Sequence, residues 1–91
     1  MEGPELDQAL EDRILQLLAD RDPGKTICPS DVARSLHADL RQSDPDGWRA
    51  LMQPTRDAAA RLVAAGEVVV TRAGEVVDVR EARGPVRIRR A

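Results

Sequence analysis

Residues 67–79, Glu-Val-Val-Val-Thr-Arg-Ala-Gly-Glu-Val-Val-Asp-Val, decide the fold class of this chain. Two valine-rich runs, 67–72 and 75–79, flank the dipeptide Ala73-Gly74. β-Branched residues favour extended strands, and a two-residue connection that ends in glycine is typical of a tight turn between antiparallel strands. The sequence therefore predicts a β-hairpin.

A further strand is predicted near the C-terminus. Residues 83–85, Arg-Gly-Pro, are followed by the alternating run Val-Arg-Ile-Arg at residues 86–89. Successive side chains of a strand point to opposite faces. We therefore expect Val86 and Ile88 to face the core and the two arginines to face outward.

Two amphipathic helices are predicted in the first half of the chain. The first covers residues 5–20, where leucine and isoleucine recur on one helical stripe. Residues 26–28 are expected to be extended, because the residue before a proline avoids helical geometry. The second helix is expected over residues 30–38, or on to residue 40, with Ser30 as its N-cap.

A third helix is predicted from Pro45 to Gly66, with Asp44 as its cap. Its apolar residues keep helical spacing throughout, from Trp48 to Val63. Pro54 lies inside this stretch and lacks a backbone N–H. We therefore expect a kink or a brief break near Gln53 rather than two separate helices.

Helix, short strand, helix, helix and hairpin is the element order of a winged helix, in which the hairpin is the wing. The predicted fold is therefore α+β: a winged helix-turn-helix with three α-helices, a β-hairpin wing and a C-terminal strand. One domain over residues 1–91 is expected, with residues 1–4 flexible. The connection between the second and third helices, residues 39–44, is longer than a strict helix-turn-helix allows, which weakens any inference from fold to DNA binding.

Several short motifs support this interpretation independently. They are Thr-Ile-Cys-Pro-Ser-Asp-Val-Ala-Arg at 26–34, Trp-Arg-Ala-Leu-Met at 48–52, Pro-Thr-Arg at 54–56, Gly66, Val-Asp at 77–78 and Arg-Gly-Pro-Val-Arg at 83–87. Together they resemble a small bacterial winged-helix family that is known only as a domain of unknown function. The resemblance covers about residues 10–90. It implies the fold and a bacterial source, and it implies no activity.

Composition narrows the range of functions. Trp48 is the single aromatic residue among 91, whereas cofactor cages, base-stacking platforms and sugar sites commonly use several rings. No apolar run approaches the roughly 20 residues that a membrane span needs. Cys28 is the single cysteine and cannot form an internal disulfide. We therefore expect a cytoplasmic protein with no membrane contact.

The net charge of −2 conceals an asymmetry between the two ends of the chain. Residues 1–24 carry seven acids and two arginines, whereas residues 80–91 carry five arginines and one acid. Attraction between the two ends could hold the C-terminal segment against the first helix. A polyanion could also bind this basic C-terminal segment, although the protein as a whole is not basic.

Four residues are candidates for structural ion pairs that would follow from this asymmetry. Arg34 of the second helix could pair with Asp78 at the end of the hairpin. Arg83 or Arg87 could pair with an acid of the first helix. These residues would then belong to the scaffold rather than to a binding site.

For nucleic acid, the third helix offers Arg49, Gln53 and Arg56. At 100° per residue these three side chains fall within about 60° of one another on one flank of the helix. Arginine and glutamine are side chains that read base edges in the major groove. Arg72, near the tip of the wing, could meet a phosphate or the minor groove.

The alternative interpretation of this flank is a solvated helix face with internal ion pairs. Asp57 and Arg61, four residues apart in the favoured order, look like such a pair. A protein-interaction or homodimerisation module without nucleic-acid binding is then the competing function. Trp48, the first helix and the last strand are the features that a protein partner could use.

Catalysis and metal binding have little support in the sequence. His37 and Cys28 are each the single residue of their type, whereas a structural zinc site needs four ligands. No glycine-rich phosphate loop and no nucleophile–base arrangement is present. We therefore expect a non-enzymatic binding module without metal or cofactor. Duplex DNA is the first ligand to test.

Overall fold

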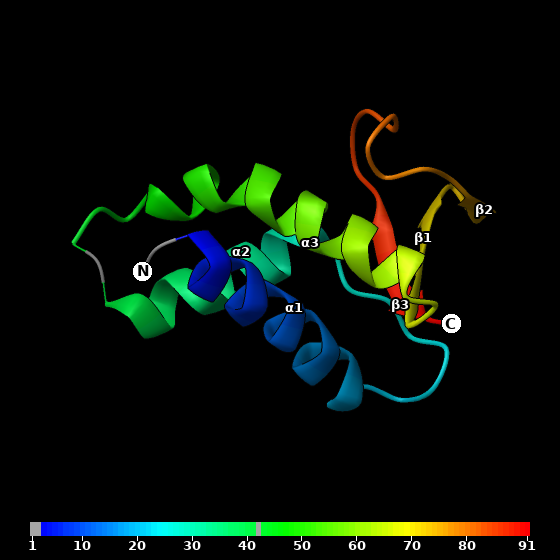
Figure 1. The fold of residues 1–91 in the computed structure, drawn as a ribbon, viewed down its shortest axis with the longest axis horizontal. Helices are drawn as coiled ribbons and strands as arrows, with labels where there is room; N and C mark the ends of the chain where they lie inside the picture. The colour runs from blue at the N-terminus through cyan, green and yellow to red at the C-terminus, as the bar shows by residue number, and fades with distance from the viewer. Residues whose placement is uncertain (1–2, 42) are drawn as a thin grey trace.

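Helices fill the first two thirds of the chain and strands the last third (Figure 1). The computed structural model describes residues 3–41 and 43–91. The helices are α1 (Gly3–Ala19), α2 (Pro29–Leu40), the 3₁₀ helix η1 (Gly47–Leu51) and α3 (Met52–Ala64). The strands are β1 (Val68–Arg72), β2 (Glu75–Val76) and β3 (Arg87–Arg90). Within the described residues this α+β arrangement agrees with the predicted class and is compatible with the winged-helix layout.

The hairpin prediction is confirmed by the sheet, whose strand order is β2-β1-β3. β1 and β2 pair antiparallel across Ala73-Gly74, where both residues have positive φ, 52° and 85°. Such a pair of positive φ values is the turn geometry that matches the twist of a hairpin. β2 is shorter than expected because the chain turns at Asp78, whose carboxylate accepts a hydrogen bond from the N–H of Arg80.

β3 also pairs antiparallel with β1, so β1 is the central strand. The predicted alternation is confirmed: Val86 and Ile88 are buried, whereas Arg87 is exposed and Arg89 is half-buried. Ile88 also forms an isolated β-bridge with Ile27, which lies in the extended segment predicted before α2. The segment between α1 and α2 is thus hydrogen-bonded to the outer edge of β3 at this one position.

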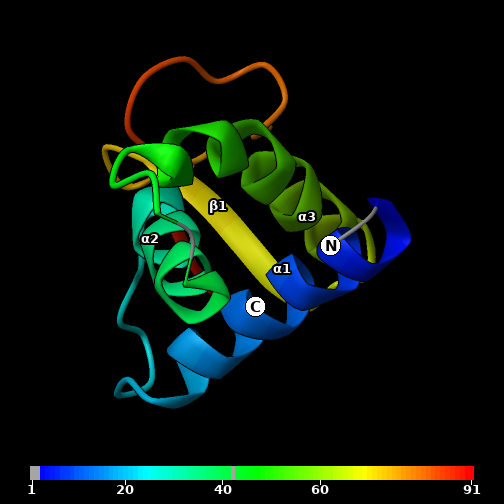
Figure 2. The ribbon, with the colours of Figure 1, turned by 90° about the vertical axis from the view of Figure 1, so that its left-hand side faces the viewer.

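The core lies between the helices and the sheet. Figure 2 shows β1 behind the helices, between α2 and α3, with α1 running across the lower part of the view. Most of the apolar stripe predicted for each helix is buried here together with one face of β1 and β3. Val63, the last residue of the third predicted stripe, is the exception and is exposed. The largest fully buried apolar side chains are Leu10, Ile14, Ile27, Ile88, Val32, Val68, Val70 and Val86.

α2 begins one residue earlier than predicted, and its N-cap is Cys28 rather than Ser30. Pro29 occupies the first helical position, where its fixed φ suits the helix and its missing N–H costs nothing. The Asp31 carboxylate accepts a hydrogen bond from the N–H of Cys28 at 3.0 Å. The Ser30 hydroxyl lies 3.0 Å from the Cys28 Sγ and does not cap the helix.

This helix start affects the titration of Asp31. Burial alone would raise the pKa of Asp31, but its hydrogen bonds with Cys28 and the positive charges of Arg21 and Arg87 outweigh burial and lower the pKa below its ordinary value of 3.8. A carboxylate with a lowered folded-state pKa stabilises the fold above its unfolded-state pKa, and the contribution is lost as the pH falls through the folded-state pKa. We expect Asp31→Asn to lower the free energy of unfolding by about 0.5 kcal/mol at neutral pH, because the amide keeps a hydrogen-bond acceptor but loses the negative charge at the start of the helix.

The difference in the free energy of unfolding between wild type and Asp31→Asn should shrink as the pH falls below 3.8. Urea denaturation at a series of pH values measures it. Glu75→Gln, on the exposed strand β2, is the control and should show no comparable pH dependence. A difference for Asp31→Asn that stays constant down to strongly acid pH would contradict the assignment.

The third predicted helix consists of the 3₁₀ helix η1 followed directly by α3; the helix type changes between Leu51 and Met52, close to the predicted kink or break near Gln53, and no residue outside a helix separates the two. Pro54 is the third residue of α3, where a backbone N–H has no partner within the helix, so the proline is accommodated without a kink. The helical part begins at Gly47 rather than at Pro45.

α1 includes Gly3 and Pro4, which were predicted to be flexible, and residues 1–2 lie outside the described part of the chain. In the described residues, no helix is both long enough and apolar enough to cross a membrane.

Candidate functional site

Trp48 and two arginines form an exposed cluster where α2 meets η1. The guanidinium carbon of Arg34, on α2, lies 4.2 Å from the centroid of the Trp48 ring, and that of Arg49, on η1, lies 4.6 Å from it. Both distances are within the range of a cation–π interaction. We call Arg34, Trp48 and Arg49 the Arg–Trp patch. It places two cations on the single aromatic ring of the chain.

The surroundings of the patch leave both guanidiniums accessible. The side chain of Arg49 is 69% exposed, and its contact with an acid is a loose one, 3.9 Å to Asp46. Arg34 is exposed as well, and among the described residues no carboxylate lies within ion-pair distance of it. The predicted pair of Arg34 with Asp78 is therefore wrong. The Arg34 side chain stacks on Trp48, while Asp78 accepts the N–H of Arg80.

Gln53 lies one turn beyond Arg49, at the exposed start of α3, and its side-chain amide donates to Asp57 at 3.0 Å. Asp57 therefore does not form the predicted pair with Arg61. Arg61 instead reaches α1, where its Nε donates to Glu11 at 2.9 Å. That contact joins α3 to the acidic first helix through two partly exposed side chains.

Arg56, predicted to face nucleic acid, is half-buried and turned towards the segment between β2 and β3. We call residues 77–86 the wing loop, which rises beside the sheet in orange in Figure 1. The Arg56 guanidinium donates to three backbone carbonyls of this loop, those of Val79, Ala82 and Gly84. Its N–H groups are thus largely used inside the molecule, and Arg56 is not presented to a groove of DNA.

Arg72, the fourth predicted nucleic-acid residue, is exposed at the end of β1, where its guanidinium donates to the carbonyl of Arg83 at 3.0 Å. Arg56 and Arg72 thus hold the same wing loop from two sides. The structure brings together Arg49 and Gln53 of the predicted set and places Arg56 and Arg72 elsewhere. Arg34 lies beside Arg49 on the Trp48 ring. The sequence spacing does not reveal this, because a turn separates the two arginines.

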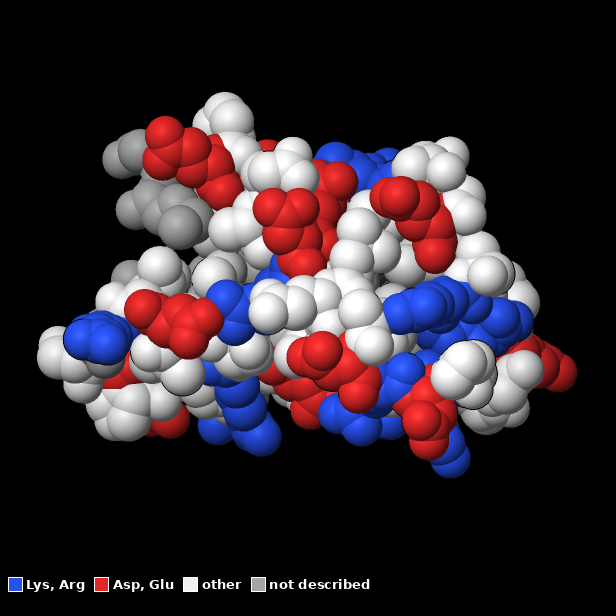
Figure 3. All heavy atoms as spheres, turned by 90° about the horizontal axis from the view of Figure 1, so that it is seen from below, with Lys and Arg blue, Asp and Glu red and all other residues white. Residues whose placement is uncertain are grey.

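The predicted ion pair of Arg83 or Arg87 with α1 is absent from the described residues. Arg87 donates from Nε to the Thr26 hydroxyl at 2.8 Å and from a terminal nitrogen to the Thr26 carbonyl at 3.2 Å. The Ile27–Ile88 bridge is the reason, since it sets β3 beside the segment before α2. Figure 3 shows acidic side chains spread over one face, with the largest group of Lys and Arg side chains towards the end where the sheet lies.

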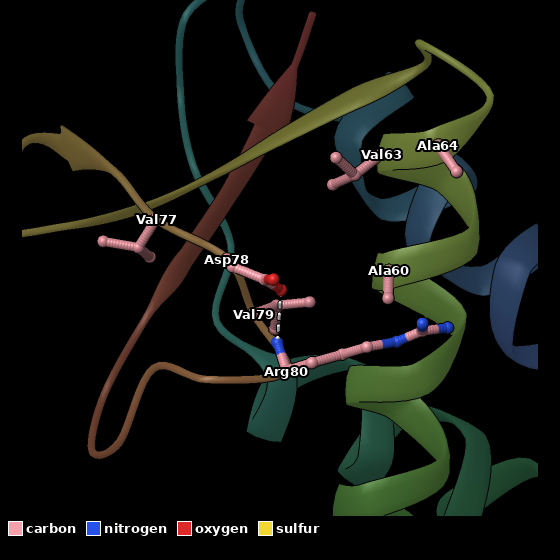
Figure 4. Close-up of a pocket in the computed structure, with 7 residues that line it drawn as sticks. All are labelled: Ala60, Val63, Ala64, Val77, Asp78, Val79 and Arg80. Carbon is pink, nitrogen blue, oxygen red and sulfur yellow. Dashed lines mark hydrogen bonds between the residues drawn. The ribbon is translucent and has the colours of Figure 1, made fainter.

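A shallow cleft separates α3 from the wing loop (Figure 4). Its volume is about 260 Å³. Small apolar side chains of α3 face it, and the Arg80 side chain extends across towards the helix. The lining residues are Ala60, Val63, Ala64, Val77, Asp78, Val79 and Arg80. The side of the cleft that α3 forms is therefore apolar, and the arginine among the lining residues comes from the wing loop.

A second cavity, of about 400 Å³, lies where the start of α2, the start of α3 and the end of the wing loop meet. Its lining includes Cys28, Ser30 and Met52 together with the guanidinium residues Arg56 and Arg87. Four of the sequence motifs, at 26–34, 48–52, 54–56 and 83–87, thus come together in space. In the part of the chain that the structure describes, no group of three His, Cys, Asp or Glu side chains could hold a metal ion.

Comparison with known families agrees with the motifs. A family model described as "Protein of unknown function (DUF3253)" matches residues 7–91. The chain belongs to the DUF3253 family. The match includes η1, α2, α3, all three strands and most of α1 of this DUF3253 domain. No curated protein matches the chain. The resemblance to a family of unknown function is confirmed, and its implied bacterial source stays a prediction.

Proposed function

We propose that this DUF3253 domain is a non-enzymatic winged-helix module of the cytoplasm that binds duplex DNA through the Arg–Trp patch. The observation that carries the proposal is the pair of exposed guanidiniums, Arg34 and Arg49, on one tryptophan ring at the junction of α2 and η1. In helix-turn-helix proteins the N-terminal residues of the recognition helix contact base edges while the preceding helix crosses the backbone. In the proposed complex Arg49, on η1 directly before α3, contacts the bases, and Arg34, on α2, contacts the DNA backbone.

The chemistry of the patch supports the same ligand. A guanidinium donates two parallel hydrogen bonds to phosphate or to the edge of guanine. Stacking on Trp48 restricts both side chains before binding, so less conformational entropy is lost when they meet the duplex. Gln53, one turn further along, adds a side chain that can read adenine. The proposed contact set is therefore Arg34, Arg49 and Gln53.

Fluorescence anisotropy with a labelled duplex of random sequence, titrated at several salt concentrations, tests the proposal. Affinity should fall steeply with salt, because each phosphate contact releases counterions. The double variant Arg34→Ala/Arg49→Ala should bind about tenfold more weakly or worse, and its salt slope should be smaller by about two. Lys25→Ala removes an exposed cation from the α1–α2 connection and should leave binding unchanged.

Equal losses of DNA affinity in the double variant and in Lys25→Ala would mean that binding depends only on overall charge. That result would reject the Arg–Trp patch as the contact surface. Absence of binding at low salt would reject DNA as the ligand.

A protein-interaction or homodimerisation module is the second candidate, and the apolar cleft beside α3 favours it. Val63 and Val76 are 41% and 71% exposed and are the large hydrophobic side chains on the described surface. Val63 lines the cleft together with Ala60 and Ala64 of α3, and these small alanines would let another backbone approach closely. A dimer that persists on dilution in sizing experiments, together with no DNA binding at low salt, would favour this function over the first.

A further inference from the structure

Two cations, Arg56 and Arg87, line the cavity at the start of α2, and no Asp or Glu is among its lining residues. In the described part of the chain neither arginine has a carboxylate within ion-pair distance. Asp31, at the start of the same helix, accepts the N–H of Cys28 and interacts with the charge of Arg87 from beyond that distance. The lining of the cavity is therefore electropositive.

The two guanidiniums are held in place by neutral groups. Arg56 is fixed by the carbonyls of Val79, Ala82 and Gly84, and Arg87 by the hydroxyl and carbonyl of Thr26. Carbonyl and hydroxyl oxygens orient a guanidinium but do not cancel its charge. A guanidinium has five N–H donors, so each arginine keeps N–H groups beyond those used in these bonds. Such preorganised donors favour an anion.

The remaining walls are apolar. Met52, Pro85 and Val86 line the cavity beside the small polar side chains of Cys28 and Ser30. The volume of about 400 Å³ lies within the range of small-molecule sites, which combine apolar walls with a few placed polar groups. We infer that this cavity binds a small organic anion, a carboxylate or phosphate with an apolar body, whose charged end meets Arg87 and Arg56. This inference does not depend on DNA binding.

The probes are benzoate, phenyl phosphate, neutral benzamide and inorganic phosphate, each titrated into ¹⁵N-labelled protein and followed by amide chemical shifts. Benzoate or phenyl phosphate should shift the amides of Ser30, Gly84 and Val86 in a saturable way. Benzamide and inorganic phosphate should each bind at least about tenfold more weakly, because one lacks the charge and the other the apolar body.

Arg87→Gln should weaken the affinity for the organic anion by about tenfold or more, which is the effect of losing one charge-assisted hydrogen bond. Arg89→Gln is the matched control on the same strand, because it makes the same change of charge at a residue outside the cavity. Arg87 is exposed, so its replacement should leave the fold intact, which the unperturbed remainder of the spectrum checks.

Three results would overturn the inference. The first is no saturable shift at the cavity amides with either organic anion. The second is equal binding of benzamide, or of inorganic phosphate, to that of the organic anions. The third is an equal loss of affinity in Arg87→Gln and Arg89→Gln, which would show a diffuse charge effect instead of a site.

Discussion

Ile88→Ala should lower the free energy of unfolding by about 3 kcal/mol, the usual cost of removing a large aliphatic side chain from a well-packed core. Ile88 is 0% exposed and lies in β3 opposite Val70 of the central strand. Its backbone also exchanges two hydrogen bonds with Ile27, at 2.7 and 2.9 Å. The side chain therefore packs where the sheet, the helices and the segment before α2 meet, and neighbours tied by these bonds cannot collapse into the space it leaves.

Chemical denaturation and thermal melting measure this effect, and the melting temperature should fall by about 15 °C for a domain of this size. Val76→Ala is the matched control, a β-branched residue of the same sheet that is 71% exposed. Its free energy of unfolding should change by no more than about 0.5 kcal/mol. Similar values for the two variants would mean that β3 does not pack against the core as described.

Arg56→Ala should lower the free energy of unfolding by about 2 to 3 kcal/mol, because a charged donor is worth more than a neutral one and two of its acceptor carbonyls belong to the buried Val79 and the half-buried Ala82. The wing loop loses three hydrogen bonds in this variant, those to Val79, Ala82 and Gly84. Arg56→Lys should recover less than half of the loss, since an ammonium group cannot span three carbonyls as a planar guanidinium does. Urea denaturation measures the stability of both variants.

Hydrogen exchange separates the two roles considered for Arg56. Amides of the wing loop should exchange faster in Arg56→Ala, while those of α1 should follow the global change in stability. Arg49→Ala is the control, because Arg49 is 69% exposed and its ion pair with Asp46 is loose. That variant should keep its stability within about 0.5 kcal/mol. If Arg56→Ala is as stable as the wild type, Arg56 does not anchor the wing loop and instead lies on the exposed flank predicted from its helical spacing.

The elements of the fold were largely predictable because their signals are local. Valine runs around Ala73-Gly74 specify the hairpin, and the alternation at 86–89 specifies which side of β3 faces the core. The start of α2 was misplaced by one residue because Ser30 and Cys28 compete for the cap, and Pro29 decides between them in favour of Cys28. An interruption near Gln53 was predicted from Pro54. The helix type does change just before α3, but Pro54 itself is accommodated in the first turn of α3.

The candidate site was less predictable because helical periodicity places a residue on a flank and leaves its partners open. Arg49, Gln53 and Arg56 share a flank by spacing, yet Arg56 bonds to the wing loop, 23 to 28 residues further along the chain. Arg34 was assigned to Asp78 on charge alone and instead stacks on Trp48. Opposite charges far apart in sequence give no preference among several partners of similar energy.

The amino-acid order alone determined the α+β class, the hairpin and its turn, and the inward side of each helix and strand, since period and turn chemistry act over a few residues. Only the tertiary structure decided which arginines are anchors and which are exposed, and that Cys28, Met52 and Arg87 border one cavity. A guanidinium on a long side chain bonds to whatever acceptor the packed chain brings near, and that acceptor is set by the contacts of the whole core.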